Sequence, residues 1–326
     1  VTSVTIDGSA TAFASGLVSR SFTLVPGRNV FRIEVKDAAG NVAKDSAVYV
    51  VAGTNAQIAA GGYFGLHLDE AGTVTFWGDE FSLPTDLGVV KEVAAAGRLA
   101  LFLKSDGSVV SVGSGSIPAP MQPALSDVKH VFAGTYGTDQ QNGIAILQDD
   151  SWVLWGYSAT HAYVDSARAN APKAIKLAVG RDFIIVHRPD STAVSWKIAN
   201  SDTIRTEHGK VKTVTGSYYD GAVLRNDGTI ETVRGGYYNL SGATGIKLLD
   251  AGLLQAAGVT TGDLPVNWGK TGNGQGRFAS PFPMDVISVG SGFRYNAFLM
   301  STGKILVFGE SKALKNIPPS ILWTAP

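Results

Sequence analysis

Hydrophobic residues alternate with other residues along many short stretches of this chain. The alternation is clear where two leucines or isoleucines flank a single residue, as at Leu66 and Leu68 and again at Ile144 and Ile146. A period of two residues is typical of β-strands, because successive side chains of a strand point to opposite faces. Turns of the Asp-Gly or Ala-Gly kind separate the stretches. This combination predicts an all-β protein.

The predicted strands belong to a unit that is repeated seven times between Ile58 and Phe308. Each copy has a first apolar strand, a turn with small residues, a second alternating strand, a tight turn and a further strand. We anchor the first strands on Ile58, Val93, Val131, Leu177, Val214, Leu248 and Val289. The third copy has extra residues between Thr135 and Asn142. In the other six copies the position 14 residues beyond the anchor lies in the tight turn, at Gly72, Gly107, Ser191, Gly228, Gly262 and Gly303.

Such a unit cannot bury its apolar faces alone, so its copies must stack on one another. With a strand in the variable segment that follows, each copy supplies about four strands, which is the size of a propeller blade. The seven copies therefore predict a seven-bladed β-propeller. We expect the segment from Ile317 to Trp323 to close the ring by joining the blade that contains Ile58, since closure leaves few strand edges exposed.

The first copy reads Ile58-Ala-Ala-Gly-Gly-Tyr-Phe-Gly-Leu-His-Leu68 and then Gly72-Thr-Val-Thr-Phe-Trp-Gly78. This pattern resembles the repeat of the regulator of chromosome condensation family and its bacterial relatives, including the propeller-type β-lactamase inhibitor proteins. The resemblance extends over residues 55–326, although later copies replace Trp-Gly, for example by Val112-Gly113 and Val233-Arg234. It implies a seven-bladed scaffold and no particular partner.

Residues 1–52 differ from the repeats and predict a separate domain before the propeller of residues 53–326. Strands are expected at residues 1–6, 19–24, 30–35 and 47–51, with a turn between Asp37 and Asn41. The stretch from Thr23 to Asn41 resembles the later half of a bacterial immunoglobulin-like module. Since a complete module needs roughly 85 to 100 residues, we expect a partial immunoglobulin-like β-sandwich, completed by upstream strands or by a neighbour.

Composition limits the classes of partner. Lys plus Arg and Asp plus Glu are equal at 27 each, so no overall field attracts DNA or an anionic membrane. The absence of cysteine excludes disulfides, thiol catalysis and thiolate metal sites. No apolar run is long enough for a transmembrane helix, and the chain starts at Val1 without a signal peptide. We expect a processed product or a fragment of a longer chain with upstream modules.

The sequence contains no recognisable catalytic constellation. The five histidines fall in different repeats or connections, which disfavours a metal site. Carboxylate pairs such as Asp69-Glu70 and Asp149-Asp150 lie at turns, where aspartate accepts backbone hydrogen bonds. No Gly-x-Ser-x-Gly nucleophile motif occurs. We therefore predict no catalytic residues, no metal and no cofactor.

The loops that follow the first strands are the main candidate for binding. In a propeller such loops gather at one end of the axis, and tyrosine and arginine are enriched where proteins recognise one another. Exposed loops that simply vary in sequence are the alternative explanation. Five residues beyond each anchor, Leu253 stands in the sixth copy, and the predicted ligand-binding residues stand in the others: Tyr63, Arg98, Tyr136, Asp182, Tyr219 and Arg294.

Aromatic residues in the connections are a second candidate. They occur from Tyr157 to Tyr163, at Tyr218-Tyr219 and at Tyr237-Tyr238, and loops on a rigid scaffold commonly carry binding residues.

The function predicted from these features is non-enzymatic recognition by a secreted or surface-exposed bacterial protein. The partner would be a protein or a glycan on another cell or surface, as for an adhesin, with neither nucleic acid binding nor membrane insertion. The expected location is extracellular or at the bacterial cell surface. Two alternatives stay open: a polysaccharide-active enzyme with Asp182 and Asp220 at the axis, and an architectural spacer in a large adhesin.

Overall fold

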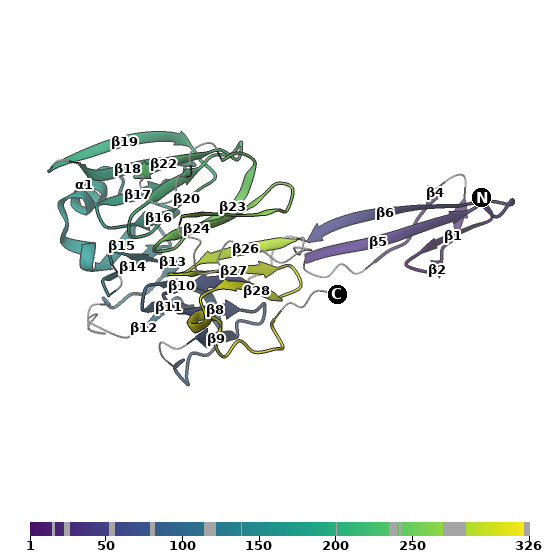
Figure 1. Ribbon diagram of the computed structural model, residues 1–326, viewed down its shortest axis with the longest axis horizontal. Coiled ribbons are helices and arrows are strands. Elements are labelled where there is room, and N and C mark those ends of the chain that lie inside the picture. The colour runs from purple at the N-terminus through teal and green to yellow at the C-terminus, as the bar shows by residue number, and fades with distance from the viewer. Residues whose placement is uncertain are drawn as a thin grey trace. The chain divides into compact units, whose positions relative to one another are not determined.

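The computed structural model describes residues 1–14, 17–22, 27–51, 56–78, 82–113, 122–137, 139–199, 201–234, 240, 243–269 and 285–322, with the backbone alone at 27–30 and 48–51. The chain forms two compact units, Val1–Thr54 and Asn55–Pro326, here called unit 1 and unit 2. Nearly all regular structure in both is β-strand (Figure 1). None of the helices in the described part of the chain has the length and apolar character needed to cross a membrane.

Unit 1 contains one four-stranded antiparallel sheet with the order β2-β1-β5-β6. Its strands are β1 (Ser3–Ile6), β2 (Ser9–Ala10), β5 (Gly27–Lys36) and β6 (Val42–Val51), and a separate small hairpin joins β3 (Phe13–Ala14) to β4 (Leu17–Val18). The carboxylate of Asp37 forms the β5–β6 turn by accepting the backbone N–H groups of Ala39 and Asn41, both at 2.9 Å. The hydrogen bond from the Asn41 side chain is the main cause that lowers the pKa of Asp37, and the backbone hydrogen bonds lower it further.

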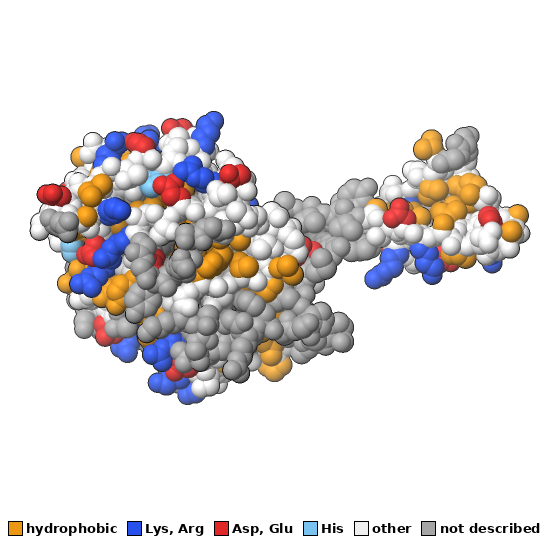
Figure 2. Space-filling model, turned by 45° about the horizontal axis from the view of Figure 1, so that its top comes forward, with side chains coloured by type: hydrophobic (Ala, Val, Ile, Leu, Met, Phe, Trp, Pro, Cys, Tyr) orange, Lys and Arg blue, Asp and Glu red, His pale blue; other side chains and the backbone are white. Residues whose placement is uncertain are grey.

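Unit 1 differs in part from the predicted sandwich. The strands expected at residues 1–6, 30–35 and 47–51 are present, whereas residues 19–22 are not in a strand and residues 23 and 24 lie outside the described part. Val4 and Ile6 are buried, but Leu17 is 75% exposed, and Figure 2 shows other hydrophobic side chains at the surface of this unit. The described residues thus form one sheet and a hairpin, and the immunoglobulin-like assignment stays a prediction.

Unit 2 contains seven small antiparallel sheets in its described residues, numbered here sheets 1 to 7 in chain order. Each consists of strands that follow one another along the chain and pair in that order. They are β7 (Gln57–Ala60), β8 (Phe64–Leu68) and β9 (Val74–Gly78); β10 (Val90–Ala96), β11 (Leu99–Lys104) and β12 (Val109–Gly113); β13 (Val128–Thr135), β14 (Gln141–Leu147) and β15 (Trp152–Gly156); β16 (Lys176–Val179), β17 (Phe183–His187), β18 (Thr192–Ala199) and β19 (Asp202–Lys210); β20 (Thr213–Gly216), β21 (Gly221–Leu224) and β22 (Ile230–Arg234); β23 (Ile246–Ala251), β24 (Gln255–Thr260) and β25 (Pro265–Gly269); and β26 (Val286–Ser291), β27 (Tyr295–Met300) and β28 (Ile305–Gly309).

The turn between the second and third strands is the same in every sheet. Its fourth residue has a positive φ and donates its N–H to the carbonyl of the first, as Gly72 does to Asp69 at 3.1 Å and Gly228 does to Arg225 at 3.0 Å. The predicted position is correct in five of the six named copies. It is wrong in the copy anchored on Leu248, where the residue with positive φ is Asp263 and not Gly262.

The error in the sixth copy is a register shift of one residue. Leu249 pairs with Gly258, as Val93 pairs with Phe102 in sheet 2, so Leu249 and not Leu248 is the equivalent anchor. A β-bulge three residues before the anchor, at Ile246, supports this register, since sheet 2 has its bulge at Val90. The sequence pattern does not distinguish the two registers, because Leu248 and Leu249 are adjacent and equally apolar.

The fourth strand predicted for each blade occurs only in sheet 4, as β19, among the described residues. After sheet 3 the chain forms η2 (Tyr157–Thr160) and helix α1 (Ala162–Asn170), and after sheet 7 it forms η3 (Ser311–Leu314). Tyr163, Val164 and Ala167 of α1 are buried against apolar residues of sheets 3 and 4. In this segment a helix covers the apolar surface for which the sequence predicts an outer strand.

The core of unit 2 lies between neighbouring sheets. Phe64 and Leu66 of sheet 1 pack with Val93 and Phe102 of sheet 2 in one cluster. The last and first sheets meet in the same way, since Leu299 and Ile305 pack with Ile58 and Trp77.

The C-terminal segment lies at this junction of sheets 7 and 1. The N–H of Gly78 donates to the carbonyl of Lys315 at 2.9 Å, and Ile317 and Ile321 pack on the shared cluster. The segment was expected to join sheet 1. Among its described residues the strand pairing is instead with sheet 7, between Leu322 and Ile305. Trp323 lies outside the described residues.

Candidate functional site: the loop ring and the axial cavity

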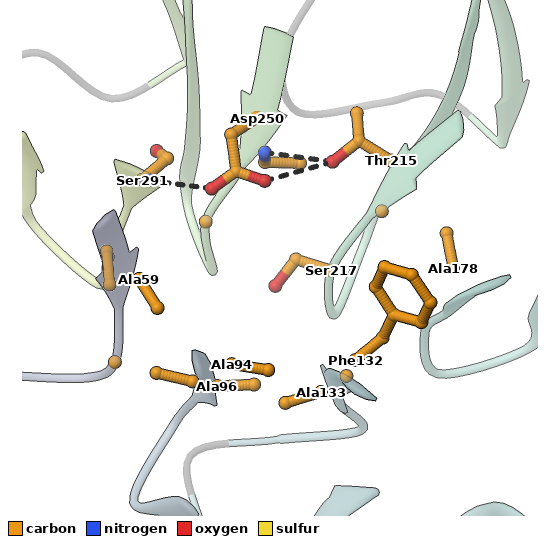
Figure 3. A pocket seen from close by; sticks show the side chains of 18 of the residues that line it. Ala59, Ala94, Ala96, Phe132, Ala133, Ala178, Thr215, Ser217, Asp250 and Ser291 are labelled. Atoms are coloured by element: carbon orange, nitrogen blue, oxygen red, sulfur yellow. Dashed lines mark hydrogen bonds between the residues drawn. The ribbon is translucent and has the colours of Figure 1, made fainter. Parts of the chain in front are cut away.

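The first strands of all seven sheets line one cavity, here called the axial cavity, with a volume of about 630 Å³. Each strand contributes at least two residues, from β7 through β26. Much of the wall is made of small side chains, including Ala59, Ala94, Ala133 and Ala178, with Phe132 as a larger one (Figure 3). Alanine at these positions leaves the space that larger side chains would fill.

The loops that follow the first strands lie at one end of this cavity, and several of them are hydrogen-bonded to a neighbouring loop. Phe293 donates its N–H to the carbonyl of Gly62 at 3.2 Å, and Gly62 donates to Gly97 at 2.5 Å. Arg181 donates to Tyr218 at 3.0 Å. We call these seven connections the loop ring; its described residues are 61–63, 97–98, 136–137, 139–140, 180–182, 217–220, 252–254 and 292–294.

Two of the six predicted ligand-binding residues, Tyr63 and Arg98, line the axial cavity. The Tyr63 ring meets the Phe293 ring edge to face at 5.4 Å. The Arg98 guanidinium lies 3.3 Å from the carboxylate of Asp139. Both residues therefore lie at the end of the cavity that the loop ring surrounds.

The other four lie in the loop ring away from the cavity lining. Asp182 forms an ion pair with Arg234 at 2.8 Å, and Arg294 forms one with Glu310 at 3.4 Å. Tyr136 and Tyr219 belong to an aromatic cluster described next. Neither Asp182 nor Asp220, which is 1% exposed, lines the cavity, so the two carboxylates considered for a polysaccharide-active enzyme do not meet at the axis.

An aromatic cluster connects the loop ring with the segment after sheet 3. Tyr136 lies 4.4 Å from Tyr157 and 6.5 Å from Tyr218, and Tyr218 lies 4.0 Å from Tyr219, measured between ring centroids. His161 lies between 5.5 and 5.7 Å from the rings of Tyr136, Tyr157 and Tyr163. We call Tyr136, Tyr157, His161, Tyr163, Tyr218 and Tyr219, with Arg181, the aromatic patch.

The patch has a buried base and an accessible surface. Tyr163 is buried, which raises the pKa of its hydroxyl, whereas Tyr157 is 45% exposed. The Arg181 guanidinium is exposed and lies 5.7 Å from the Tyr218 ring centroid, a cation–π geometry. The two candidate regions that the sequence suggested separately, the loops and residues 157–163, thus form one surface. Tyr237 and Tyr238 lie outside the described residues.

Apart from Arg98, the charged residues of the cavity were missed by sequence reasoning. Glu92 contacts His130 at 3.1 Å, Arg98 pairs with Asp139, Lys247 pairs with Asp263, and Lys212 is exposed. Lys176 and Asp250 have no ion-pair partner in the described part of the chain. With Leu249 as anchor, Asp250 occupies the position where sheets 1, 2 and 4 have Ala59, Ala94 and Ala178. The correct register would have revealed it.

Polar contacts hold both of these charged groups in place. The carboxylate of Asp250 accepts the Ser291 N–H at 2.8 Å and the Thr215 hydroxyl at 3.3 Å (Figure 3). The Lys176 ammonium donates to the Thr213 hydroxyl at 3.1 Å. Burial is the main cause that lowers the pKa of Lys176 and raises the pKa of Asp250. Each charge is therefore only partly compensated by its surroundings.

A second polar cluster contains a serine, a histidine and a glutamate connected in the same order as in the catalytic triad of a serine hydrolase. The Ser195 hydroxyl lies 2.8 Å from Nε2 of His208, whose Nδ1 lies 2.8 Å from the Glu231 carboxylate. However, Ser195 is 1% exposed and His208 is 4% exposed, and a nucleophile must reach the substrate carbon. We assign this cluster to the packing of sheet 5 against the outer strands of sheet 4.

No group of three or more possible metal ligands is present among the residues that the structure describes. Of the five histidines, His67, His187 and His208 are buried, and burial lowers the pKa of His67 and His187. On the face of unit 2 that Figure 2 shows, basic and acidic side chains are interspersed, in keeping with the equal numbers of each in the sequence.

No protein-family model matches the chain, and no curated protein matches it. Solved structures do. The CRINKLY WD40 ectodomain of the Arabidopsis thaliana receptor kinase ACR4 is 14% identical, with a TM-score of 0.55 over 78% of this chain and 95% of that one. Human WBSCR16 is 14% identical, with a TM-score of 0.54 over 82% of this chain and 90% of that one.

Prp20p from Saccharomyces cerevisiae, the yeast RCC1, is also 14% identical, with a TM-score of 0.53 over 79% of this chain and 83% of that one. This likeness agrees with the propeller fold implied by the sequence resemblance. The bacterial origin, the likeness to β-lactamase inhibitor proteins and the immunoglobulin-like module stay predictions. At 14% identity the likeness shows the fold alone, and the chain contains a β-propeller.

Proposed function

We propose that this protein is a non-enzymatic binding module that recognises another protein through its loop ring, with the aromatic patch as the main contact. The observation that carries this proposal is the assembly of the patch from four connections that are separate in the sequence, after β13, β15, β16 and β20. Accessible tyrosine and arginine side chains on a rigid scaffold are typical of protein recognition.

The comparisons support the class of function. The structure of Prp20p is described together with its binding to Gsp1p and histones, so a propeller of this kind serves protein binding in that case. Histones are basic partners, and the neutral charge of this chain disfavours the same choice here.

The proposal extends to the architecture and the setting. We take sheets 1 to 7 as the seven blades of one closed ring, because their first strands line the same cavity. We take the chain as part of a secreted or cell-surface protein, adhesin-like, with unit 1 as part of an immunoglobulin-like module. A glycan partner is an outcome that the experiment below distinguishes.

The test compares two double variants on a protein array and a glycan array. Tyr157→Ala/Tyr218→Ala removes two patch rings, and Leu264→Ala/Ile204→Ala removes two exposed apolar side chains, of the β24–β25 turn and of β19, outside the patch. We expect a protein ligand whose affinity falls about tenfold or more in the patch variant and is unchanged in the control. Ligands bound equally by both variants, or binding to glycans alone, would contradict the proposal.

The absence of catalysis can be tested at the triad-like cluster. A fluorophosphonate, which reacts with activated serines, should leave Ser195 unlabelled in the folded protein because this hydroxyl is buried. Labelling that disappears in Ser195→Ala, with the same melting temperature, would identify a serine hydrolase site instead.

A further inference from the structure

We propose that the axial cavity is a binding site for a small zwitterion, a molecule whose carboxylate is held by Lys176 and whose ammonium group is held by Asp250. This site is separate from the aromatic patch, and the proposal does not depend on protein binding there.

The cavity has the size and lining of a small-molecule site. Its volume of about 630 Å³ lies within the usual range for ligand pockets, roughly 300 to 1,000 Å³. Such pockets are mostly apolar with a few fixed polar groups. Here the alanines supply the apolar wall, and Asp250 stands on it beside Thr215 and Ser291 (Figure 3).

Lys176 and Asp250 are the charged groups of the cavity that remain after those with a charged partner or an exposed charge are set aside. Among the residues that the structure describes, seven charged ones line it: Glu92, Arg98, Asp139, Lys176, Lys212, Lys247 and Asp250. Four have partners of opposite charge or potential charge, as described above, and Lys212 is exposed and donates to the carbonyl of Lys247 at 2.8 Å. Lys176 is attracted electrostatically by Asp250 and by Glu92 but forms an ion pair with neither. An ammonium and a carboxylate that face the same cavity without touching are matched by a ligand with one charge of each sign.

Both side chains keep hydrogen-bonding capacity for such a ligand. An ammonium group has three donors, and one contact, to Thr213, is made by Lys176. A carboxylate has about four acceptor sites, and Asp250 accepts contacts from Ser291, from Thr215 and from the backbone N–H of Ala251. The same fixed contacts restrict where each charge can move, which favours one length of ligand over another.

The topology gives the direction of the ligand and the offset of its two charges along the axis. Lys176 precedes its anchor Leu177, and Asp250 follows its anchor Leu249, so they stand two positions apart along equivalent strands. Two residues of strand rise about 7 Å. The carboxylate of the ligand would therefore lie toward the tight-turn end and its ammonium group toward the loop ring. Since the two residues stand on different sheets, ω-amino acids of several chain lengths are the suitable probes.

The experiment is calorimetric titration of the whole chain with 4-aminobutyrate, 5-aminopentanoate and 6-aminohexanoate. Pentanoate keeps only the carboxylate of 5-aminopentanoate, and pentylammonium keeps only its ammonium group. We expect at least one zwitterion to bind with a millimolar or lower Kd, and each half to bind about tenfold more weakly or not at all, because a charge-assisted contact is lost. Equal binding of either half, or no heat from any zwitterion at tens of millimolar, would overturn the proposal without any variant.

Two variants locate the site. Lys176→Met keeps the length of the side chain without its charge, and Asp250→Asn keeps the shape of the carboxylate. Each should weaken the best zwitterion by about tenfold or more, while Lys210→Ala, which removes an exposed lysine of β19, should leave the affinity unchanged. Unchanged affinity in both cavity variants would place the binding elsewhere and refute the assignment.

Discussion

The two ends of the sheets in unit 2 follow different rules. At the tight-turn end every sheet has the same hydrogen-bonded turn with a residue of positive φ at the same place, among them Gly72, Asp150 and Ser191. At the loop-ring end the equivalent positions hold Tyr63, Arg98, Tyr136, Asp182, Tyr219 and Arg294. A backbone requirement recurs in every copy because the geometry is the same, whereas side chains that face a partner need not recur. The contrast separates the part of the repeat that makes the fold from the part available for recognition.

Substitutions in the strands between the two ends are expected to cause the largest losses of stability. Leu103→Ala and Leu299→Ala remove side chains that are fully buried between sheets, and each should lower the free energy of unfolding by about 2 to 5 kcal/mol. Chemical denaturation measures this. A loss below about 0.5 kcal/mol would show that these positions face solvent.

At the tight-turn end, glycine is required for two separable reasons. Gly303 has φ +76° with open space around it, so Gly303→Ala should cost about 1 to 2 kcal/mol for the left-handed backbone alone. Gly228 has φ +81°, and an added Cβ would lie 2.8 Å from the backbone nitrogen of Ile246. Gly228→Ala should therefore cost about 1 to 3 kcal/mol more. Equal losses in the two variants would mean that the neighbouring strand moves aside freely.

At the loop-ring end, substitutions should affect binding and not folding. Tyr219→Ala should change the stability by about 0.5 kcal/mol or less, and it should cost about 1 to 2 kcal/mol in affinity once a protein partner is identified. Arg294→Ala provides a comparison within the ring but outside the aromatic patch. If both variants keep full affinity, the recognition surface is not the loop ring.

The tight-turn end should also respond to acid. Hydrogen bonds from the hydroxyl and N–H two residues later lower the pKa of Asp106, Asp149, Asp190 and Asp227 below 3.8. Because the folded-state pKa is the lower one, these groups stabilise the fold above the unfolded value, and this contribution is lost as pH falls through the folded-state pKa.

Replacing all four by asparagine keeps the acceptor oxygens but removes the titration. The melting temperature of the variant should therefore fall less steeply than that of the wild type as pH decreases below about 4. Parallel curves for the two proteins would show that other carboxylates control the acid response.

The sequence predicted what depends on local geometry and missed what depends on neighbours. The seven copies, their strands and five of the six named turn positions follow from alternation and turn chemistry, which are local. The register of the sixth copy was wrong because Leu248 and Leu249 are equally apolar, and with it Asp250 was missed. The aromatic patch was divided into two candidates because 20 or more positions separate Tyr136, Tyr157 and Tyr218 along the chain. The outer strand was replaced by α1 because packing on sheets 3 and 4 accepts a helix there.

The junction of sheets 7 and 1 has a consequence for the order of folding. Each sheet pairs strands that are neighbours along the chain, so pairing within a sheet closes only short loops. The junction instead joins distant parts, since the Tyr295 hydroxyl donates to the carbonyl of Phe64, 231 positions away. Closing so long a loop costs entropy before any contact there is gained. The junction is thus expected to be the last step of folding and the first to open under mechanical or thermal stress, while the sheets on either side persist.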